Sequence, residues 1–489
     1  MARILWRATV VTHRYLGVAV ALLMLMWFGS GIVMMYVAFP EISAKERIAI
    51  LSPIAWQACC ALGDLKIPDD RPIQAAQIEN LLGAPVLRLK PNAQPFLVTD
   101  LQKGGAVEID AVKARAIASE AAARLTGAAR QPVLSETIDH DQWTVGENFD
   151  RDRPVQHFVF DDAQRTHIYV TSATGEVVLW TRAGQRFWNW LGAIPHWLYF
   201  AQLRSRPELW TQVVIWTSIL GGFLTALGLI LGITQFKRGK SGRLSPYRGW
   251  FYWHHIVGLV FGVLTLTWVV SGTLSVNPWG LLEGHGGNER VRLAGEPISW
   301  SNVRSSLQAL KSSPPPGETL SLSSAPLNGK LFWLATGRDG RVQRLDAQGQ
   351  PLPVSEADLA AAAQRLADAN GIESQQMITS EDSYYFGFAD LANRNTLLLP
   401  VYRVILNDAE HTRFYLEPRS AALLGKIDAG SRGYRWWFNG LHRLDFTAWL
   451  RARPFWDALM LVLLLGGIGV TATGAYLAFT RIRRDLGFG

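Results

Sequence analysis

Four long segments of this chain contain no Asp, Glu, Lys or Arg, and they constrain its fold more than any other feature. They cover residues 15–40, 209–236, 249–281 and 458–480. As a helix rising about 1.5 Å per residue, each can cross a hydrocarbon layer of about 30 Å. Tryptophan and tyrosine gather near their ends, as at bilayer surfaces: Trp6, Tyr36, Trp210, Trp250, Tyr252, Trp253, Trp279 and Trp456. We therefore predict a bundle of four transmembrane helices.

Basic residues in the short segments predict the orientation of this bundle. The N-terminus and the loop 237–249 carry Lys and Arg without acidic residues, and the tail 481–489 contains three arginines. Such segments stay in the cytoplasm, so the net charge of +8 reflects topology and no nucleic-acid partner is expected. The predicted layout is helices at 1–40, 208–236, 250–279 and 456–480, extracytoplasmic domains at 41–207 and 280–455, a loop at 237–249 and a tail at 481–489.

The two halves of the chain repeat one another. Residues His13, Gly17, Trp27, Ser30 and Gly31 recur as His254, Gly258, Trp268, Ser271 and Gly272, each 241 positions later. A second block recurs 246 positions later, with His196, Trp210, Gly221, Thr225 and Gly228 matched by His442, Trp456, Gly467, Thr471 and Gly474. Because each copy contains two spans, the copies are predicted to be parallel, with matched residues at equal depth. The recurrence also argues against a cleaved signal peptide at the N-terminus.

The matched histidines point to a cofactor. A single histidine at a membrane surface is usually a polar anchor, but duplication at two depths favours a shared role. Axial ligation of haem iron is the chemistry that most readily uses paired histidines in an apolar bundle. We expect His13 to face His254 near the cytoplasmic side and His196 to face His442 near the outer side. Each pair would hold one haem b, since no Cys-x-x-Cys-His motif for covalent attachment is present.

Residues beside the ligands leave several alternatives open. Gly17 and Gly258 lie one helical turn after their histidines, where glycine suits either a flat cofactor or close helix packing. For Ser30-Gly31 and Ser271-Gly272 packing is favoured. His255 could replace His254 as the ligand, but only His254 fits the spacing. Arg14, with Arg204, Arg206, Arg443, Arg451 and Arg453 near the other site, could pair with haem propionates or contact lipid headgroups.

The extracytoplasmic segments are predicted to form two α+β domains. Helices are expected at Asp110–Leu125 and Glu356–Ala369, and strand–turn–strand units at Arg165–Trp180 and Thr412–Asp428. Segments 310–318 and 337–353 are predicted loops, and the aromatic segments 185–202 and 432–450 are expected at the membrane surface. Cys59 and Cys60 could be incidental thiols, a vicinal disulfide or ligands. No role is assigned to His140, His157, His167, His285 and His411.

These motifs resemble the PepSY-associated transmembrane family. The resemblance rests on His-Arg-Tyr-Leu-Gly at 13–17, Gly-Glu-Val at 175–177 and Leu-His-Arg-Leu at 441–444, in that order and across nearly the whole chain. It implies two PepSY-like periplasmic domains and a ferric-siderophore reductase of the bacterial inner membrane. No nucleotide-binding motif is present, so electrons would come from quinol or a separate cytoplasmic reductase. A membrane sensor or regulator without redox activity is the alternative, and a transporter is a third class.

Overall fold

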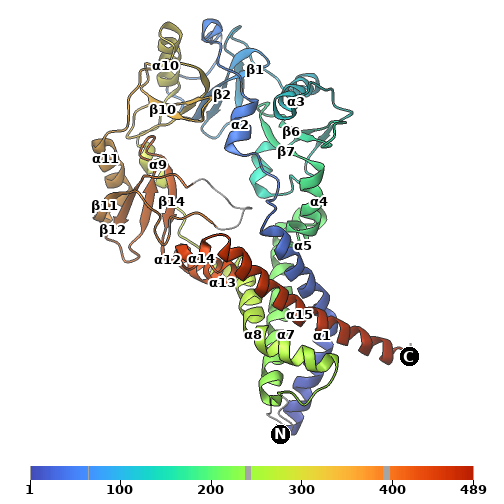
Figure 1. The fold of residues 1–489 in the computed structure, drawn as a ribbon. Coiled ribbons are helices and arrows are strands. Elements are labelled where there is room, and N and C mark those ends of the chain that lie inside the picture. Colours follow the sequence, from blue (N-terminus) through green and yellow to red (C-terminus); the bar gives the residue numbers. More distant parts are fainter. Residues whose placement is uncertain (1, 64, 237–243, 389–396, 488–489) are drawn as a thin grey trace.

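A computed structural model describes residues 2–63, 65–236, 244–388 and 397–487. It has a bundle of long helices at one end and a β-rich part at the other, with the N-terminus at the far end of the bundle (Figure 1). The long helices are α1 (Ala2–Met34), α7 (Pro207–Gln235), α8 (Trp250–Leu274) and α15 (Phe455–Asp485). In the described residues, these four are long and apolar enough to cross a membrane, as predicted. Residues 237–243 of the predicted loop lie outside the described residues.

Small residues let these helices approach one another closely. Helix α1 packs on α15 and α7, and α8 packs on α7 and α15. A methyl group added at Gly467 would lie 2.7 Å from the Phe28 ring, and one at Gly221 would lie 3.3 Å from Val269. Lipid tails are as apolar as the helices, so the hydrophobic effect does not bring membrane helices together. They associate instead through van der Waals contacts, which glycine allows to be close. The result is an apolar core through the middle of the bundle that includes Met24 and Trp268.

Two similar α+β units stand above the bundle. In the first, α3 (Ala111–Thr126) covers a sheet of order β4-β5-β6-β7, and in the second α11 (Glu356–Ala367) covers a sheet of order β11-β12-β13-β14. The side chains of Asp110 and Ser355 cap the two helices. The strands are β4 (Leu134–Ile138), β5 (Val155–Val159), β6 (His167–Thr171), β7 (Val177–Thr181), β11 (Ile372–Ile378), β12 (Val401–Leu406), β13 (Arg413–Leu416) and β14 (Leu423–Ile427). The predicted helices and strand–turn–strand units are confirmed.

A third sheet, which we call the joint sheet, contains strands from both halves of the chain. Its order is β10-β9-β8-β1-β2-β3, with β1 (Ile73–Leu81) antiparallel to β8 (Thr319–Ser324) at the centre. The other strands are β2 (Ala84–Pro91), β3 (Leu97–Asp100), β9 (Trp333–Gly337) and β10 (Val342–Leu345). Helix α10 (Trp300–Ser312) covers it and buries Trp300 and Trp333. Strand β10 falls inside the predicted loop 337–353, so that loop prediction is wrong in part, and a layout of two domains did not anticipate this sheet.

Buried arginines connect the joint sheet to its neighbours. Arg88 of β2 pairs with Glu79 of β1 at 2.6 Å and donates from Nε to the carbonyl oxygen of Thr174 in the β6–β7 turn. Arg344 of β10 pairs with Asp358 in the first turn of α11 at 3.0 Å. The joint sheet therefore contacts the first unit through one arginine and the second unit through the other.

The two cysteines form a vicinal disulfide within the joint-sheet core. Cys59 and Cys60 are both buried and bonded to each other. They pack with Trp56 and neighbouring apolar side chains. Of the alternatives left open by the sequence, the structure shows the vicinal disulfide.

Candidate functional site

Two histidines face one another at the end of the bundle remote from the sheets. His13 projects from α1 and His254 from α8, and their ring centroids lie 6.4 Å apart. A methyl group added at Gly228 of α7 would lie 2.8 Å from Cε1 of His13, and one at Gly474 of α15 would lie 3.2 Å from Cε1 of His254. Each ring therefore rests against a glycine of a neighbouring helix. We call His13 and His254 the loop-side pair.

A second pair lies where the bundle meets the sheets. His196 is on the short helix α5 (Ala193–Trp197) and His442 is on α13 (Leu441–Arg443), with ring centroids 6.2 Å apart. Two residues after each histidine the chain turns through the left-handed conformation, at Leu198 and Leu444. A π-helical turn, Arg435–Gly440, precedes α13, a feature frequent at functional sites. We call His196 and His442 the domain-side pair.

Indole hydrogen bonds hold both short helices on the long ones. Nε1 of Trp210 on α7 donates to the carbonyl oxygen of Trp197 at 2.9 Å. Nε1 of Trp456 on α15 donates to the carbonyl oxygen of Arg443 at 2.8 Å. These donors and acceptors are matched at the 246-residue spacing, so both histidines of the domain-side pair are positioned in the same way.

The Nδ1 atoms of the domain-side pair are engaged by the long helices. Nδ1 of His196 lies 3.1 Å from both the carbonyl oxygen of Trp27 and Oγ of Ser30. Nδ1 of His442 lies 3.1 Å from Oγ of Ser271. Both serine hydroxyls donate to carbonyl oxygens of their own helices, so each accepts its hydrogen bond from Nδ1–H. Ser30 and Ser271 therefore position the imidazoles, a contact that the packing interpretation of the sequence missed.

The loop-side pair is held through the same ring atom. Nδ1 of His13 donates to the carbonyl oxygen of Leu224 at 3.1 Å. Nδ1 of His254 donates to Oγ1 of Thr473 at 3.0 Å, because that hydroxyl donates its own proton to Gly469. All four histidines thus carry the proton on Nδ1, which leaves the Nε2 lone pair for a metal. Hydrogen bonding of the other ring nitrogen is how proteins fix the tautomer and orientation of metal-ligating histidines.

Both pairs have the spacing of two imidazoles that share one metal. With metal–nitrogen bonds of about 2.0–2.1 Å and roughly 1.1 Å from nitrogen to ring centre, centroids on opposite sides of a metal lie about 6.3 Å apart. The observed separations are 6.4 Å and 6.2 Å. Both separations therefore leave room for one metal ion between the two imidazoles, as bis-histidine haem ligation requires.

The domain-side pair opens into an apolar cavity of about 390 Å³. Its walls include Trp27, Trp268, Phe438 and Met460. Burial lowers the pKa of His196 to about 4 and that of His442 to about 3. Both imidazoles are consequently neutral at physiological pH, the form that binds metal. An apolar cavity lined by two neutral histidines suits a flat hydrophobic cofactor.

Glycine also shapes the space around the rings. A methyl group at Gly31 or Gly272 would lie 3.6 Å or 3.5 Å from Cε1 of His196 or His442, respectively. At Gly258 nothing described lies within 4 Å, and at Gly17 only Leu224 does, at 3.8 Å. Gly31 and Gly272 thus contact the domain-side rings. The space beside Gly17 and Gly258 shows no close helix packing among the described residues, so of the two roles predicted for them the packing role is not supported.

His255 points away from the loop-side pair. It is buried, with Nδ1 2.7 Å from Oγ of Ser245 and Nε2 2.8 Å from the carbonyl oxygen of Gly232. Because both ring nitrogens are engaged, His255 ties the segment before α8 to α7. The geometry favours His254 over the alternative ligand His255.

Replacement of His255 separates these two roles. If the loop-side pair binds haem through His254, His255→Leu should retain the haem content of the parent, with a loss of stability of about 1–3 kcal/mol from the unsatisfied groups left behind. His254→Leu, the matched variant one residue away, should then lose the haem bound at that pair. Haem content per chain measures both, and retention of haem in His254→Leu with loss in His255→Leu would reverse the assignment.

Three of the six arginines proposed as propionate partners are paired with carboxylates. Arg204 pairs with Glu147, Arg453 with Asp457, and Arg451 with both Glu381 and Asp445. Arg14 and Arg206 are exposed. Arg443 lines the domain-side cavity beside His442. Of the predicted set, Arg443 is the one that lines this cavity.

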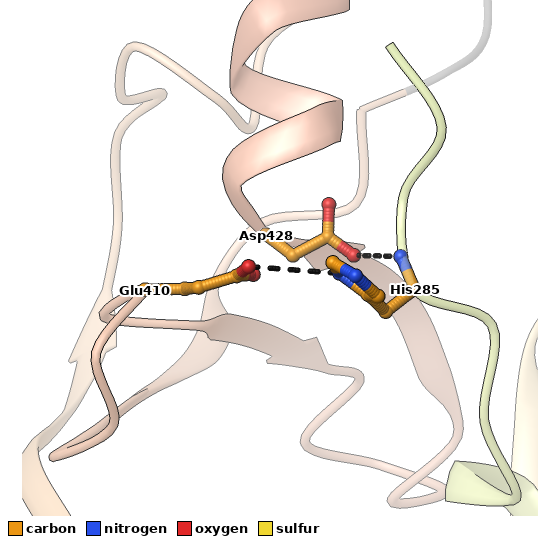
Figure 2. Close-up of side chains that lie close together, drawn as sticks. All are labelled: His285, Glu410 and Asp428. Carbon is orange, nitrogen blue, oxygen red and sulfur yellow. Dashed lines mark hydrogen bonds and ion pairs between the residues drawn. The ribbon is translucent and has the colours of Figure 1, made fainter. Parts of the chain in front are cut away.

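A separate cluster joins His285, Glu410 and Asp428 above the bundle (Figure 2). Asp428 accepts from the backbone N–H of His285 and from Ser431, whose N–H it caps at the start of α12 (Ala429–Tyr434). Lys426 also donates to the carbonyl oxygen of His285. Local hydrogen bonding accounts for the position of Asp428, and we assign the cluster a structural role.

The four spans and the apolar histidine sites define a membrane protein. The chain belongs to the family described as the PepSY-associated TM region, whose model matches residues 10–481. The resemblance inferred from the sequence is thereby confirmed over nearly the whole chain. No curated protein matches it.

Proposed function

We propose that this protein is a di-haem b-type reductase that passes electrons across the bacterial inner membrane to a ferric chelate such as a ferric siderophore. The observation that carries the proposal is the presence of two facing histidine pairs, each with metal-like spacing and with Nδ1 engaged. In the orientation predicted from the basic residues, both termini are cytoplasmic and the sheets form PepSY-like domains in the periplasm.

The two pairs are separated along the membrane normal. His13 and the Trp27 carbonyl that meets His196 lie on one straight helix, 14 positions apart, or roughly 21 Å at 1.5 Å per residue. Haem bound at each pair would supply reversible one-electron chemistry. The protein's part is to hold the ligands at two depths, orient the rings through Nδ1 and exclude water with the apolar core.

The position of the domain-side cavity supports a periplasmic acceptor. Two of its lining residues, Tyr434 and Phe438, belong to the segment that follows strand β14 of the second sheet unit. Iron(III) binds hard oxygen chelates tightly and iron(II) binds them less well. One electron delivered here would convert Fe(III) to Fe(II) and loosen the chelate.

The donor would be membrane quinol or a separate cytoplasmic reductase. The connection between α7 and α8 spans only 236–249, which is too short for a nucleotide-binding domain. The loop-side pair, at that end of the bundle, would receive the electron.

Reconstituted vesicles test the proposal. Protein is inserted into liposomes, dithionite is trapped inside, and a ferric chelate with a colorimetric Fe(II) trap is added outside. We expect Fe(II) outside at a rate proportional to inserted protein, and none with the His196→Ala variant. Haem-free protein, or haem-loaded protein that moves no electrons, would contradict the proposal, and a haem-free protein would favour a PepSY-type sensor or regulator.

A further inference from the structure

The apolar core between the two histidine pairs contains a pair of aromatic rings in tilted contact. The rings of Phe28 on α1 and Trp268 on α8 have centroids 5.7 Å apart, and each side chain is 5% exposed. Among the ring contacts of the described residues, it is the one formed by two members of the bundle's apolar core. Both side chains also line the domain-side cavity.

Neighbouring residues hold the Phe28 and Trp268 rings in place. Phe28 lies on the bare backbone of Gly467, where an added methyl group would be 2.7 Å from its ring. The carbonyl oxygen of Trp268 accepts from Ser271, and the same hydroxyl accepts from Nδ1 of His442. Because side chains on a helix tilt toward its N-terminus, the Trp268 ring is directed from that contact toward the loop-side pair.

The matched positions of the other half lack this arrangement. Trp27 corresponds to Trp268, but the residue corresponding to Phe28 is Val269. Val269 lies against Gly221, as Phe28 lies against Gly467. The aromatic pair of Phe28 and Trp268 therefore has Val269 and Trp27 at the corresponding positions of the repeat.

Building on the proposed function, we propose that Trp268, in contact with Phe28, provides the main electronic contact between the loop-side and domain-side pairs. The two aromatic side chains fill the space between the histidine pairs with closely packed, polarisable atoms. Smaller side chains would leave part of that space empty. With haem bound at both pairs, one electron would pass from ferrous haem at the loop-side pair to ferric haem at the domain-side pair. No bond is made or broken.

Trp268 acts in this scheme without being oxidised itself. Its Nε1–H is buried and has no hydrogen-bond partner among the described residues. A charged form of the indole would therefore lack both solvent and a proton acceptor, which disfavours it. The side chain serves as a positioning residue that shortens the gap.

Flash photoreduction of the purified two-haem protein tests the inference. A soluble photodonor delivers one electron, and the redistribution between haems is followed in the visible spectrum, with His13→Ala and His442→Ala supplying the single-haem reference spectra. Trp268→Leu should slow redistribution by about tenfold or more, equivalent to about 1.4 kcal/mol of activation free energy. Trp268→Phe and the control Met24→Ala, which removes a buried side chain of the same apolar core, should each stay within about threefold of the parent.

Equal slowing in Met24→Ala and Trp268→Leu would overturn the inference, since it would indicate a general packing effect. An unchanged rate in Trp268→Leu with both haems present would also overturn it. If Trp268→Leu loses haem, Phe28→Leu replaces it, with the same expected slowing and the same contrary result. A parent protein without haem would instead contradict the proposed function, so the two failures are distinguishable.

Discussion

Replacement of His442 by alanine should reduce the haem content from two per chain to one. The remaining haem should be that of the loop-side pair, because His442 and His13 lie on separate elements with separate hydrogen-bond partners. The alanine removes the imidazole whose ring centroid lies 6.2 Å from that of His196 in the parent, so the proposed haem there would keep only one histidine. A pyridine haemochrome count on purified protein measures the effect.

Two additions sharpen this experiment. Imidazole added to His442→Ala should restore the second haem, since free imidazole can occupy the space that the His442 ring fills in the parent. His411→Ala serves as the control, because His411 is exposed and bonded to Glu373 outside the bundle. Two haems in His442→Ala without imidazole would show that His442 is not a ligand.

Replacement of Glu79 by alanine should destabilise the joint sheet strongly. Glu79 and Arg88 form an ion pair whose side chains are 6% and 3% exposed. Removal of one partner from such a pair leaves a buried charge uncompensated and costs about 3–5 kcal/mol. Urea unfolding in detergent, followed by tryptophan fluorescence because Trp300 and Trp333 lie in this core, should show the loss.

A double variant isolates the cause of that loss. Glu79→Met combined with Arg88→Met removes both charges and should be much less destabilising than Glu79→Ala alone. Glu79→Ala with parental stability would mean that Arg88 is not confined by the fold as its burial indicates.

Sequence patterns predicted the parts of this fold that depend on local composition. The four spans follow from long uncharged runs, and α3 and α11 follow from alanine-rich periodicity behind the caps Asp110 and Ser355. The duplicated spacing also predicted which histidines would face each other, and the geometry places His13 opposite His254 and His196 opposite His442.

Features that depend on distant pairing could not be read in the same way. Strands β1 and β8 pair although Ile78 and Leu322 are far apart in sequence, and no local pattern specifies such a partner. The Nδ1 acceptor of His13 is a backbone carbonyl of another helix, which carries no side-chain signal. Ser30 and Ser271 were assigned to packing because small residues in membrane helices usually serve it.

The most direct test of the account is the visible spectrum of the protein purified in detergent, oxidised and then reduced with dithionite. The account predicts a sharp reduced α-band of b-type haem and two haems per chain, as bis-histidine ligation at both pairs requires. A colourless protein, reproduced when haem is supplied during expression, would contradict it.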